Sequence, residues 1–194
     1  MEPSASPPRE YLGAPVRITL DLIAKRGLTG RIREKASPQV ARVIDKPPWP
    51  LAWVDSRVLD ELEALLLELA GRDACVELGL LAGRNLGGGM IAPVLRMAMV
   101  LFGRSPGTVF GNLDRFYSMV MRGVSFSYEP TSATSGVVVA RAQGPGVPAA
   151  MFDVTRGNLS YVFELCGVSG TVEPPKVVRH DETGAEVRLA VRWS

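Results

Sequence analysis

Residues 185–193 read Ala-Glu-Val-Arg-Leu-Ala-Val-Arg-Trp, and their apolar side chains alternate with polar or small ones. A period of two residues places one set of side chains in a core and the other in water, so this segment predicts a half-buried β-strand. The same period occurs at residues 124–129, and a turn-rich stretch separates it from the apolar run at 137–140. These two segments predict a β-hairpin.

Helical spacing of apolar residues dominates the first half of the chain. It predicts helices over 16–27, 37–46, 55–70, 73–81, 90–102 and 105–122, and a further helix over 149–166 that Gly167 ends. A strand at 176–180 precedes the final strand. The expected fold is therefore α+β, with an N-terminal helical half followed by ββαββ and helices packed on one face of a four-stranded antiparallel sheet.

The domain organisation follows from the same pattern. Residues 1–12 are expected to form a disordered tail, because the segment to Glu10 is rich in Pro and Ser and almost lacks apolar side chains. Residues 13–194 are expected to form a single α+β domain. It would comprise a basic helical arm (13–50), a helical half (51–123) and the ββαββ unit (124–194).

The composition is that of an ordinary globular protein. The chain has 194 residues and a formal net charge of +2, so no strong field favours nucleic acid or an anionic membrane surface. The apolar segment 90–102 contains Pro93 and Arg96 and is shorter than the about 20 residues that span a bilayer. Cys75 and Cys166 are expected to be buried thiols, and the absence of a signal peptide at the start favours the cytoplasm.

No reactive arrangement of residues is predicted. The single histidine, His180, lies beside Asp181 at a hairpin turn, and neither cysteine has a C-x-x-C companion. The run Gly87–Gly89 lacks the Lys-Ser/Thr of a phosphate-binding loop and predicts an interhelical joint. We therefore expect no catalytic residues, no metal site and no cofactor. An enzyme that used Asp153 and Glu164 is a weaker hypothesis, because they lie about three turns apart on one helix.

Methionine and aromatic side chains are concentrated in segments 90–102 and 109–121. Such side chains fill irregular cores, and they also line pockets for hydrophobic molecules. A helix–sheet core with an adjoining dimer face is one interpretation, and a hydrophobic ligand pocket is the other. The candidate pocket residues are Met90, Val94, Met97, Leu101, Phe110, Phe116, Tyr117 and Val120.

Basic residues outnumber acidic ones between residues 25 and 46. No aromatic side chain is interleaved among them to stack on bases, so a solvated basic face is favoured over a nucleic-acid site. Such a face could still dock an acidic protein partner. The candidate partner-binding residues are Lys25, Arg26, Arg31, Arg33 and Lys35.

Spaced single residues along 16–193 carry a family resemblance. They are Trp53, Gly79 with Gly83, Tyr117, Gly123, Tyr128, Gly157, Gly167 and the strand 187–193. On these residues the chain resembles an uncharacterised myxobacterial paralogous family. More distantly, helices followed by ββαββ are similar to a superfamily of three branches: 4-vinyl-reductase domains, small subunits of the vesicle transport-particle complex, and haem-nitric-oxide-binding domains.

The resemblance implies sensing of small molecules or acyl chains, dimerisation and scaffolding rather than catalysis. The haem branch has an axial histidine on a helix and a Tyr-x-Ser-x-Arg motif, but the segment 117–122, Tyr-Ser-Met-Val-Met-Arg, breaks that spacing. We therefore expect a non-enzymatic, homodimeric binding or signalling module for a hydrophobic small molecule or acyl chain. The alternative is a scaffolding protein that docks an acidic partner through residues 25–46.

Overall fold

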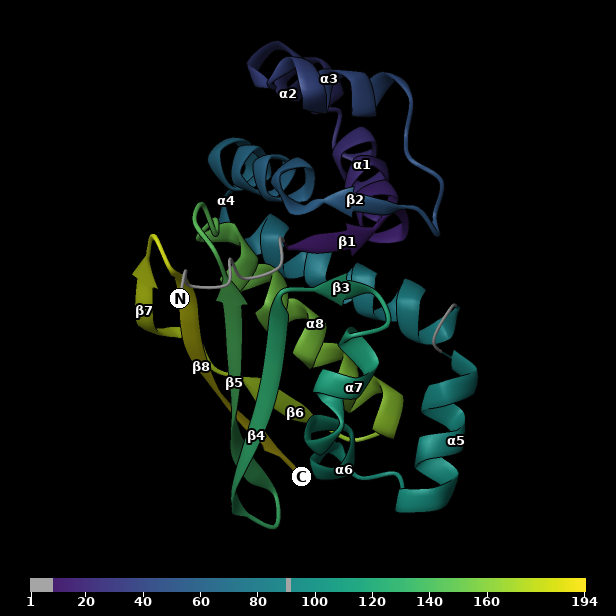
Figure 1. Cartoon of the computed structure of the whole chain (residues 1–194). Coiled ribbons are helices and arrows are strands. Elements are labelled where there is room, and N and C mark those ends of the chain that lie inside the picture. Colours follow the sequence, from purple (N-terminus) through teal and green to yellow (C-terminus); the bar gives the residue numbers. More distant parts are fainter. Residues whose placement is uncertain (1–8, 90–91) are drawn as a thin grey trace, which may run out of the picture.

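A computed structural model of the protein describes residues 9–89 and 92–194. A helical half is followed by an antiparallel sheet packed with helices, which confirms the predicted α+β class (Figure 1). The helices of the first half are α1 (Gly13–Lys25), α2 (Thr29–Lys35), α3 (Pro38–Asp45), α4 (Ser56–Gly88), α5 (Ala92–Phe102), α6 (Pro106–Gly111) and α7 (Leu113–Tyr117). Among the described residues, no helix is both long enough and apolar enough to cross a bilayer.

The larger sheet contains five described strands rather than the predicted four. They are β4 (Val124–Ser132), β5 (Ser135–Gln143), β6 (Gly170–Val172), β7 (Lys176–Asp181) and β8 (Gly184–Trp193). Their order is β4-β5-β8-β6, and β7 also pairs with β8. The strand predicted from residues 185–193 is therefore central. The short strand β6, which sequence analysis missed, pairs with the end of β8 beyond the segment that pairs with β7.

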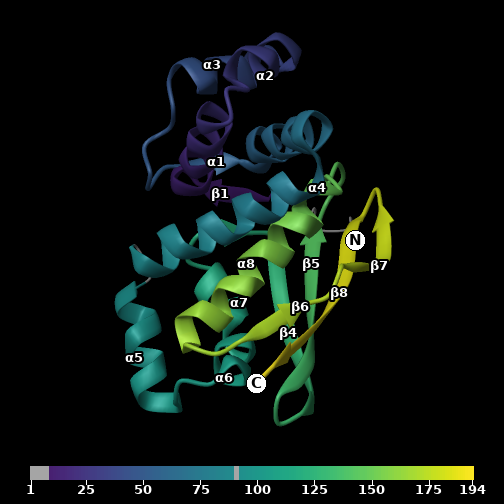
Figure 2. The same cartoon turned by 180° about the vertical axis from the view of Figure 1, so that it is seen from behind.

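Helices cover one face of this sheet in two successive layers (Figure 2). Helix α8 (Ala150–Cys166) lies on the inner face, where Val138, Val187 and Leu189 are at most 2% exposed. Helix α4 in turn packs along α8. The alternation of apolar and polar residues in β8 thus separates a buried face from an outer face, as predicted.

A second sheet joins three segments that lie far apart in the sequence. Strand β1 (Glu10–Leu12) pairs with β2 (Trp53–Asp55) on one side and with β3 (Met121–Arg122) on the other. The prediction of a disordered tail over 1–12 is therefore wrong for residues 10–12, and residues 1–8 lie outside the described residues. Strands of two or three residues show no periodicity, and only their long-range partners stabilise them.

The helix predicted over 105–122 is broken in the structure. Ser105 and Pro106 start α6 as expected, and the Ser105 side chain accepts a hydrogen bond from the Thr108 amide. The helix ends at Gly111, α7 spans residues 113–117, and the chain then turns into β3. Val109, Phe110, Leu113, Phe116 and Val120 are buried, as their apolar spacing predicts, whereas Tyr117 and Met121 are half-buried. The spacing did not reveal where the backbone leaves the helix.

Helix α4 bends at the glycine that was expected to end it. Gly71 adopts φ 80° and ψ −179°, a conformation that glycine reaches without steric cost, and the helix resumes after it. The two helices predicted over 55–70 and 73–81 are therefore two arms of one bent element. Helix α1 and the Ser37-capped α3 form where they were predicted.

Candidate functional site

Three glycines one turn apart shape the face of α4 that meets α8. A Cβ atom on Gly79 would lie 1.9 Å from the carbonyl oxygen of Val154, so the two backbones are in direct contact there. Further along, a Cβ on Gly83 or Gly87 would clash with the Tyr161 side chain, at 2.7 Å and 2.4 Å. The absence of side chains at these positions lets α4 and α8 pack closely and leaves space beside them.

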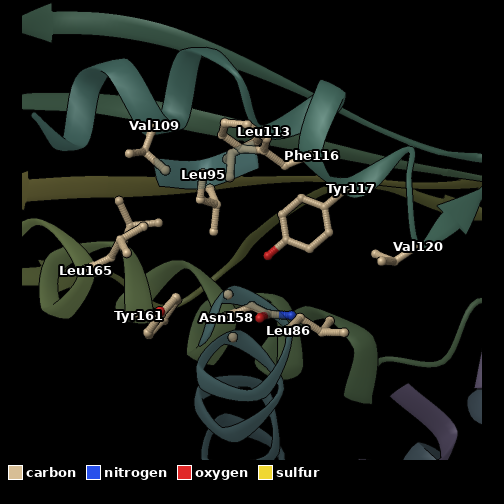
Figure 3. A pocket seen from close by; sticks show the side chains of 13 residues that line it. Leu86, Leu95, Val109, Leu113, Phe116, Tyr117, Val120, Asn158, Tyr161 and Leu165 are labelled. Carbon is tan, nitrogen blue, oxygen red and sulfur yellow. The ribbon is translucent and has the colours of Figure 1, made fainter. Parts of the chain in front are cut away.

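This space is an apolar cavity between α4, α8 and the segment α5–α7, drawn in Figure 3. Its volume is about 40 Å³. We call it the apolar cavity. Aliphatic side chains from five helices form most of its wall: Leu86, Leu95, Val109, Leu113, Val162 and Leu165.

Tyr117, Asn158 and Tyr161 are the polar side chains that line the apolar cavity. The Tyr117 ring stacks on Phe126 of β4 with centroids 4.6 Å apart, and its hydroxyl points into the cavity (Figure 3). Burial raises the Tyr117 pKa, so the hydroxyl keeps its proton and can donate. Asn158 Oδ1 is buried and has no hydrogen-bond partner among the described residues. A buried acceptor of this kind is costly unless something donates to it.

A second cavity of about 50 Å³ adjoins the first, because Leu86, Tyr117 and Asn158 line both. We call it the Glu63 cavity. Its wall includes polar side chains from β1, α1, α4 and α8: Tyr11, Thr19, Glu63 and Thr155. The first cavity therefore has an apolar wall, and the second, which shares three wall residues with it, has several polar side chains in its wall.

The Glu63 cavity lies near a buried ion pair. Arg9 donates to both carboxylate oxygens of Asp60, at 2.9 Å and 3.3 Å, and to the carbonyl oxygen of Pro145 at 3.3 Å. Both side chains of the pair are less than 10% exposed. Burial raises the Asp60 pKa to about 6, and the Arg9 guanidinium limits that rise. Near neutral pH, Asp60 is therefore ionised and its charge is compensated.

Glu63 differs from Asp60 because it has no hydrogen-bond or ion-pair partner in the described part of the chain. The residue is 6% exposed. Burial, and then the nearby Asp60 carboxylate, raise the Glu63 pKa to about 8, although the Arg9 charge acts in the opposite direction. Glu63 is therefore an acid that changes its charge near neutral pH inside the protein.

The predicted pocket residues are only partly brought together. Phe116, Tyr117 and Val120 line the apolar cavity, whereas Phe110 packs in the core against Tyr128, Phe163 and Trp193. Met97 was wrongly predicted to face the pocket: it is 59% exposed, because Leu95 and Met99 form the buried face of α5. Met90 and the side chains of Val94 and Leu101 lie outside the described residues.

The predicted basic surface is largely engaged in ion pairs within the chain. Arg26 pairs with Glu77, Arg33 with Asp45 at 2.8 Å, and Lys35 with Glu68 at 2.8 Å. Lys25 and Arg31 are exposed. The intramolecular pairs reduce the positive charge that residues 25–46 present to a partner.

Other reactive side chains are held away from the cavities or are poorly reactive. His180 Nε2 lies 2.7 Å from the carbonyl oxygen of Val147, so this ring nitrogen is engaged in a hydrogen bond to the backbone. Burial raises the Cys75 pKa to about 12, so its thiol stays protonated. Asp153 lies 3.9 Å from Arg72, whereas Glu164 pairs with Arg84 at 2.7 Å, so the two acids serve different contacts. No cluster of metal-ligating side chains occurs among the described residues.

Comparison with solved structures relates this geometry to a known fold. An Fe(II) unliganded H-NOX protein from K. algicida, carrying the mutation A71G, superposes with a TM-score of 0.70 at 13% identity, over 94% of this chain and 96% of that chain. An oxygen-binding H-NOX domain related to soluble guanylate cyclases gives a TM-score of 0.62 at 13% identity, over 94% of each chain. The chain has the H-NOX fold.

The H-NOX likeness confirms the haem-nitric-oxide-binding part of the predicted resemblance at the level of fold. The resemblance to 4-vinyl-reductase domains and transport-particle subunits stays a prediction. No model of a protein family matches the chain, and no curated protein matches it. The H-NOX fold therefore places the cavities in a known architecture without assigning a ligand.

Several residues of the site were missed by sequence analysis. The spacing Gly79-x-x-x-Gly83-x-x-x-Gly87 was an available indication of close helix packing, but two of these glycines were used only as marks of a resemblance. Asn158 and Tyr161 lie on the polar side of a predicted amphipathic helix, where a surface position is the ordinary expectation. Glu63 occurs in a charged helical segment and gives no sequence indication of burial.

Proposed function

We propose that the protein is a non-enzymatic binding module that takes up a slender hydrophobic molecule, such as a short alkyl or acyl chain, in the apolar cavity and the Glu63 cavity beside it. The observation that carries the proposal is the cavity wall, which is almost entirely aliphatic and aromatic and is built from five helices. One of the solved H-NOX domains of this fold binds oxygen, which supports a ligand-binding role for the architecture. Ligand pockets are characteristically apolar, with a few polar groups that fix orientation.

Haem is the group that the H-NOX fold implies, and the residues present do not fit it. The only histidine of the chain, His180, lies on β7 and contacts Val147 and Phe152 rather than either cavity. Arg122, the arginine of the segment that was compared with the Tyr-x-Ser-x-Arg motif, lines neither cavity. Its guanidinium lies 3.9 Å from the centre of the Trp53 ring and donates to Glu10 at 2.9 Å. The cavities, of about 40 and 50 Å³, are far smaller than the about 300–1,000 Å³ typical of sites for larger ligands.

An enzymatic role based on a pair of carboxyl groups would need two acids that act together on one substrate. Asp60 and Glu63 are close and buried, but Asp60 accepts hydrogen bonds from Nη1 and Nη2 of Arg9. Of these two acids, Glu63 is the one that lines the Glu63 cavity without a compensating cation. General acid–base chemistry by a pair of carboxylates therefore has one participant available, which favours binding over catalysis.

Ligand uptake can be tested by native mass spectrometry on protein purified without detergent, followed by titration with 1-hexanol. We expect a bound small molecule or a hexanol-dependent rise in melting temperature. The variant Val162→Phe, which fills the cavity, should abolish this shift, and Leu165→Phe is a second filling variant in case the first is unstable. Val178→Phe on the exposed strand β7 is the control and should keep it. An unshifted wild-type protein with a clean apo mass would refute the proposal.

The proposal includes a homodimer that forms through the outer face of α5. Met97 and Val100 are 59% and 83% exposed there, whereas Leu95 on the inner face lines the apolar cavity. The same helix thus connects the ligand to a surface that a second copy would cover. Sedimentation equilibrium should show a dimer that Val100→Lys dissociates. A monomer at all concentrations would refute this part. Docking of an acidic partner on residues 25–46 stays a prediction.

A further inference from the structure

The polar end of the adjoining cavities contains unsatisfied acceptors. Glu63, 6% exposed, lines the Glu63 cavity and makes no side-chain hydrogen bond or ion pair among the described residues, and Asn158 Oδ1, on the same cavity, is fully buried and has no hydrogen-bond partner there. Thr19 already donates its hydroxyl hydrogen to the Pro15 carbonyl oxygen at 3.0 Å, so towards the cavity it can only accept. Three acceptors therefore line the Glu63 cavity beside the hydroxyls of Tyr11, Tyr117 and Thr155, and a ligand that donates several hydrogen bonds would satisfy these acceptors.

The charge balance around Glu63 points to the same ligand chemistry. Arg9 and Asp60 compensate each other, so an ionised Glu63 leaves one net negative charge in the interior. The other titratable groups that act on Glu63 are Tyr11 and Cys75, and burial raises the pKa of both, which keeps them neutral. An uncompensated buried charge is strongly unfavourable, and a cationic ligand would neutralise it.

We propose that the ligand is a primary alkylamine whose ammonium group binds Glu63 and Asn158 and whose chain occupies the apolar cavity. This inference rests on the proposed function and names its ligand class. An ammonium has three donors and no acceptor, which matches a site rich in acceptors. At about 10–15 Å³ for each water-sized group, the apolar cavity of about 40 Å³ holds roughly three or four heavy atoms and the Glu63 cavity of about 50 Å³ roughly three to five, so a ligand that fills both has roughly six to nine.

The same arrangement disfavours two related head groups relative to an ammonium. A carboxylate would meet the Glu63 carboxylate, and two negative charges within one cavity repel each other. An alcohol offers one donor and no charge, so it satisfies one acceptor at most. Compounds of one chain length that differ only in the head group therefore separate the contribution of the Glu63 cavity from that of the apolar cavity.

The experiment is isothermal titration of the full chain with hexylamine, 1-hexanol and hexanoate at pH 8. We expect hexylamine to bind at least about tenfold more tightly than hexanol, and hexanoate most weakly. Glu63→Gln should weaken hexylamine about 30-fold or more and leave hexanol unchanged. The matched control is Glu68→Gln on the same helix, whose carboxylate pairs with Lys35 at the surface; this variant should bind all three as the wild type does.

Proton release provides a second readout that a structural role of Glu63 would not produce. An alkylammonium keeps its proton to about pH 10, as a lysine does. Because the Glu63 pKa is about 8, a bound ammonium displaces a proton from Glu63 below that pH. Hexylamine affinity should therefore rise about tenfold per pH unit between pH 6 and 8 and level off above. Titration at pH 6.5 in two buffers of different ionisation enthalpy should show close to one proton released.

The outcomes separate this inference from the proposed function. If hexanol and hexylamine bind equally, or if Glu63→Gln leaves hexylamine affinity unchanged, the amine assignment is wrong while the apolar cavity remains a ligand site. If none of the three compounds binds to the wild type, both proposals are refuted.

Discussion

Gly157 of α8 faces the carbonyl oxygen of Val76 on α4 so closely that a Cβ atom on the glycine would lie 1.9 Å from that oxygen. A real Cβ cannot take that position, so any side chain at residue 157 must push α4 and α8 apart. Helix α8 packs on the sheet, and α4 packs along α8 on the side of the N-terminal helices. Their separation would therefore disturb the apolar core and the adjoining cavities together.

Gly157→Ala should destabilise the protein by about 1–3 kcal/mol, although alanine is the better helix former, because overpacking against a backbone carbonyl outweighs propensity. Chemical denaturation measures this change. Gly30→Ala is the matched control, since a Cβ at Gly30 in α2 would meet no atom within 4 Å. That variant should be neutral or stabilised by up to about 1 kcal/mol. Equal effects of the two variants would contradict the close contact.

Removal of the Arg9 guanidinium should be among the most damaging changes outside the apolar core. Arg9→Met leaves the Asp60 carboxylate buried without compensation, and breaking a buried ion pair costs about 3–5 kcal/mol. The free energy of unfolding should fall accordingly, and Asp60→Leu in the same chain should restore part of it. Asp45→Asn breaks the Arg33 pair, whose side chains are more than half exposed, and should leave the free energy of unfolding almost unchanged, because solvent screens that pair.

The Arg9 pair also shows what the sequence could not reveal. Residue 9 belongs to a segment rich in Pro and Ser, and nothing local indicates that its charge is buried against a residue 51 positions away. Strand β8 and helix α8 were predicted because ten or more residues repeat a period, which local sequence records. Strands β1, β3 and β6 have two or three residues and depend on partners distant in the chain.

The candidate site was predictable to a similar extent. Phe116, Tyr117 and Val120 were found because an apolar stripe is visible in sequence, even though the helix that was expected to carry them is broken. Asn158 and Glu63 were not found, because a polar residue on a helix is ordinarily exposed and its burial is decided by tertiary packing. Sequence therefore indicated the apolar half of the site and concealed the polar half.

Gly167 should be sensitive for a conformational reason alone. It ends α8 in the left-handed region at φ 70°, and a Cβ there would meet no atom within 4 Å. Gly167→Ala should therefore cost about 1 kcal/mol through backbone strain, without steric overlap. Gly111→Ala, also without neighbours but at an ordinary φ, should not be destabilised. The difference between their denaturation midpoints tests the prediction, and a neutral Gly167→Ala would contradict it.

Glu63 should make the stability of the ligand-free protein fall as pH rises towards 8. Its pKa is about 8 in the folded chain against an ordinary value of 4.5, so between these values the folded protein binds a proton that the unfolded chain has released. Raising the pH therefore removes stability, by at most about 1.4 kcal/mol per pH unit, and the loss levels off above pH 8. Asp60, with a pKa of about 6, contributes in the same direction only at lower pH.

The interval from pH 6.5 to 8 consequently isolates Glu63, and urea denaturation across it measures the slope. Glu63→Gln cannot ionise, so its free energy of unfolding should stay level there and exceed that of the wild type at pH 8. Glu68→Gln retains Glu63 and should keep the wild-type slope. A wild-type protein with no slope in this interval would mean that Glu63 is solvated or paired in the folded state, because only an uncompensated buried carboxyl holds its proton to so high a pH.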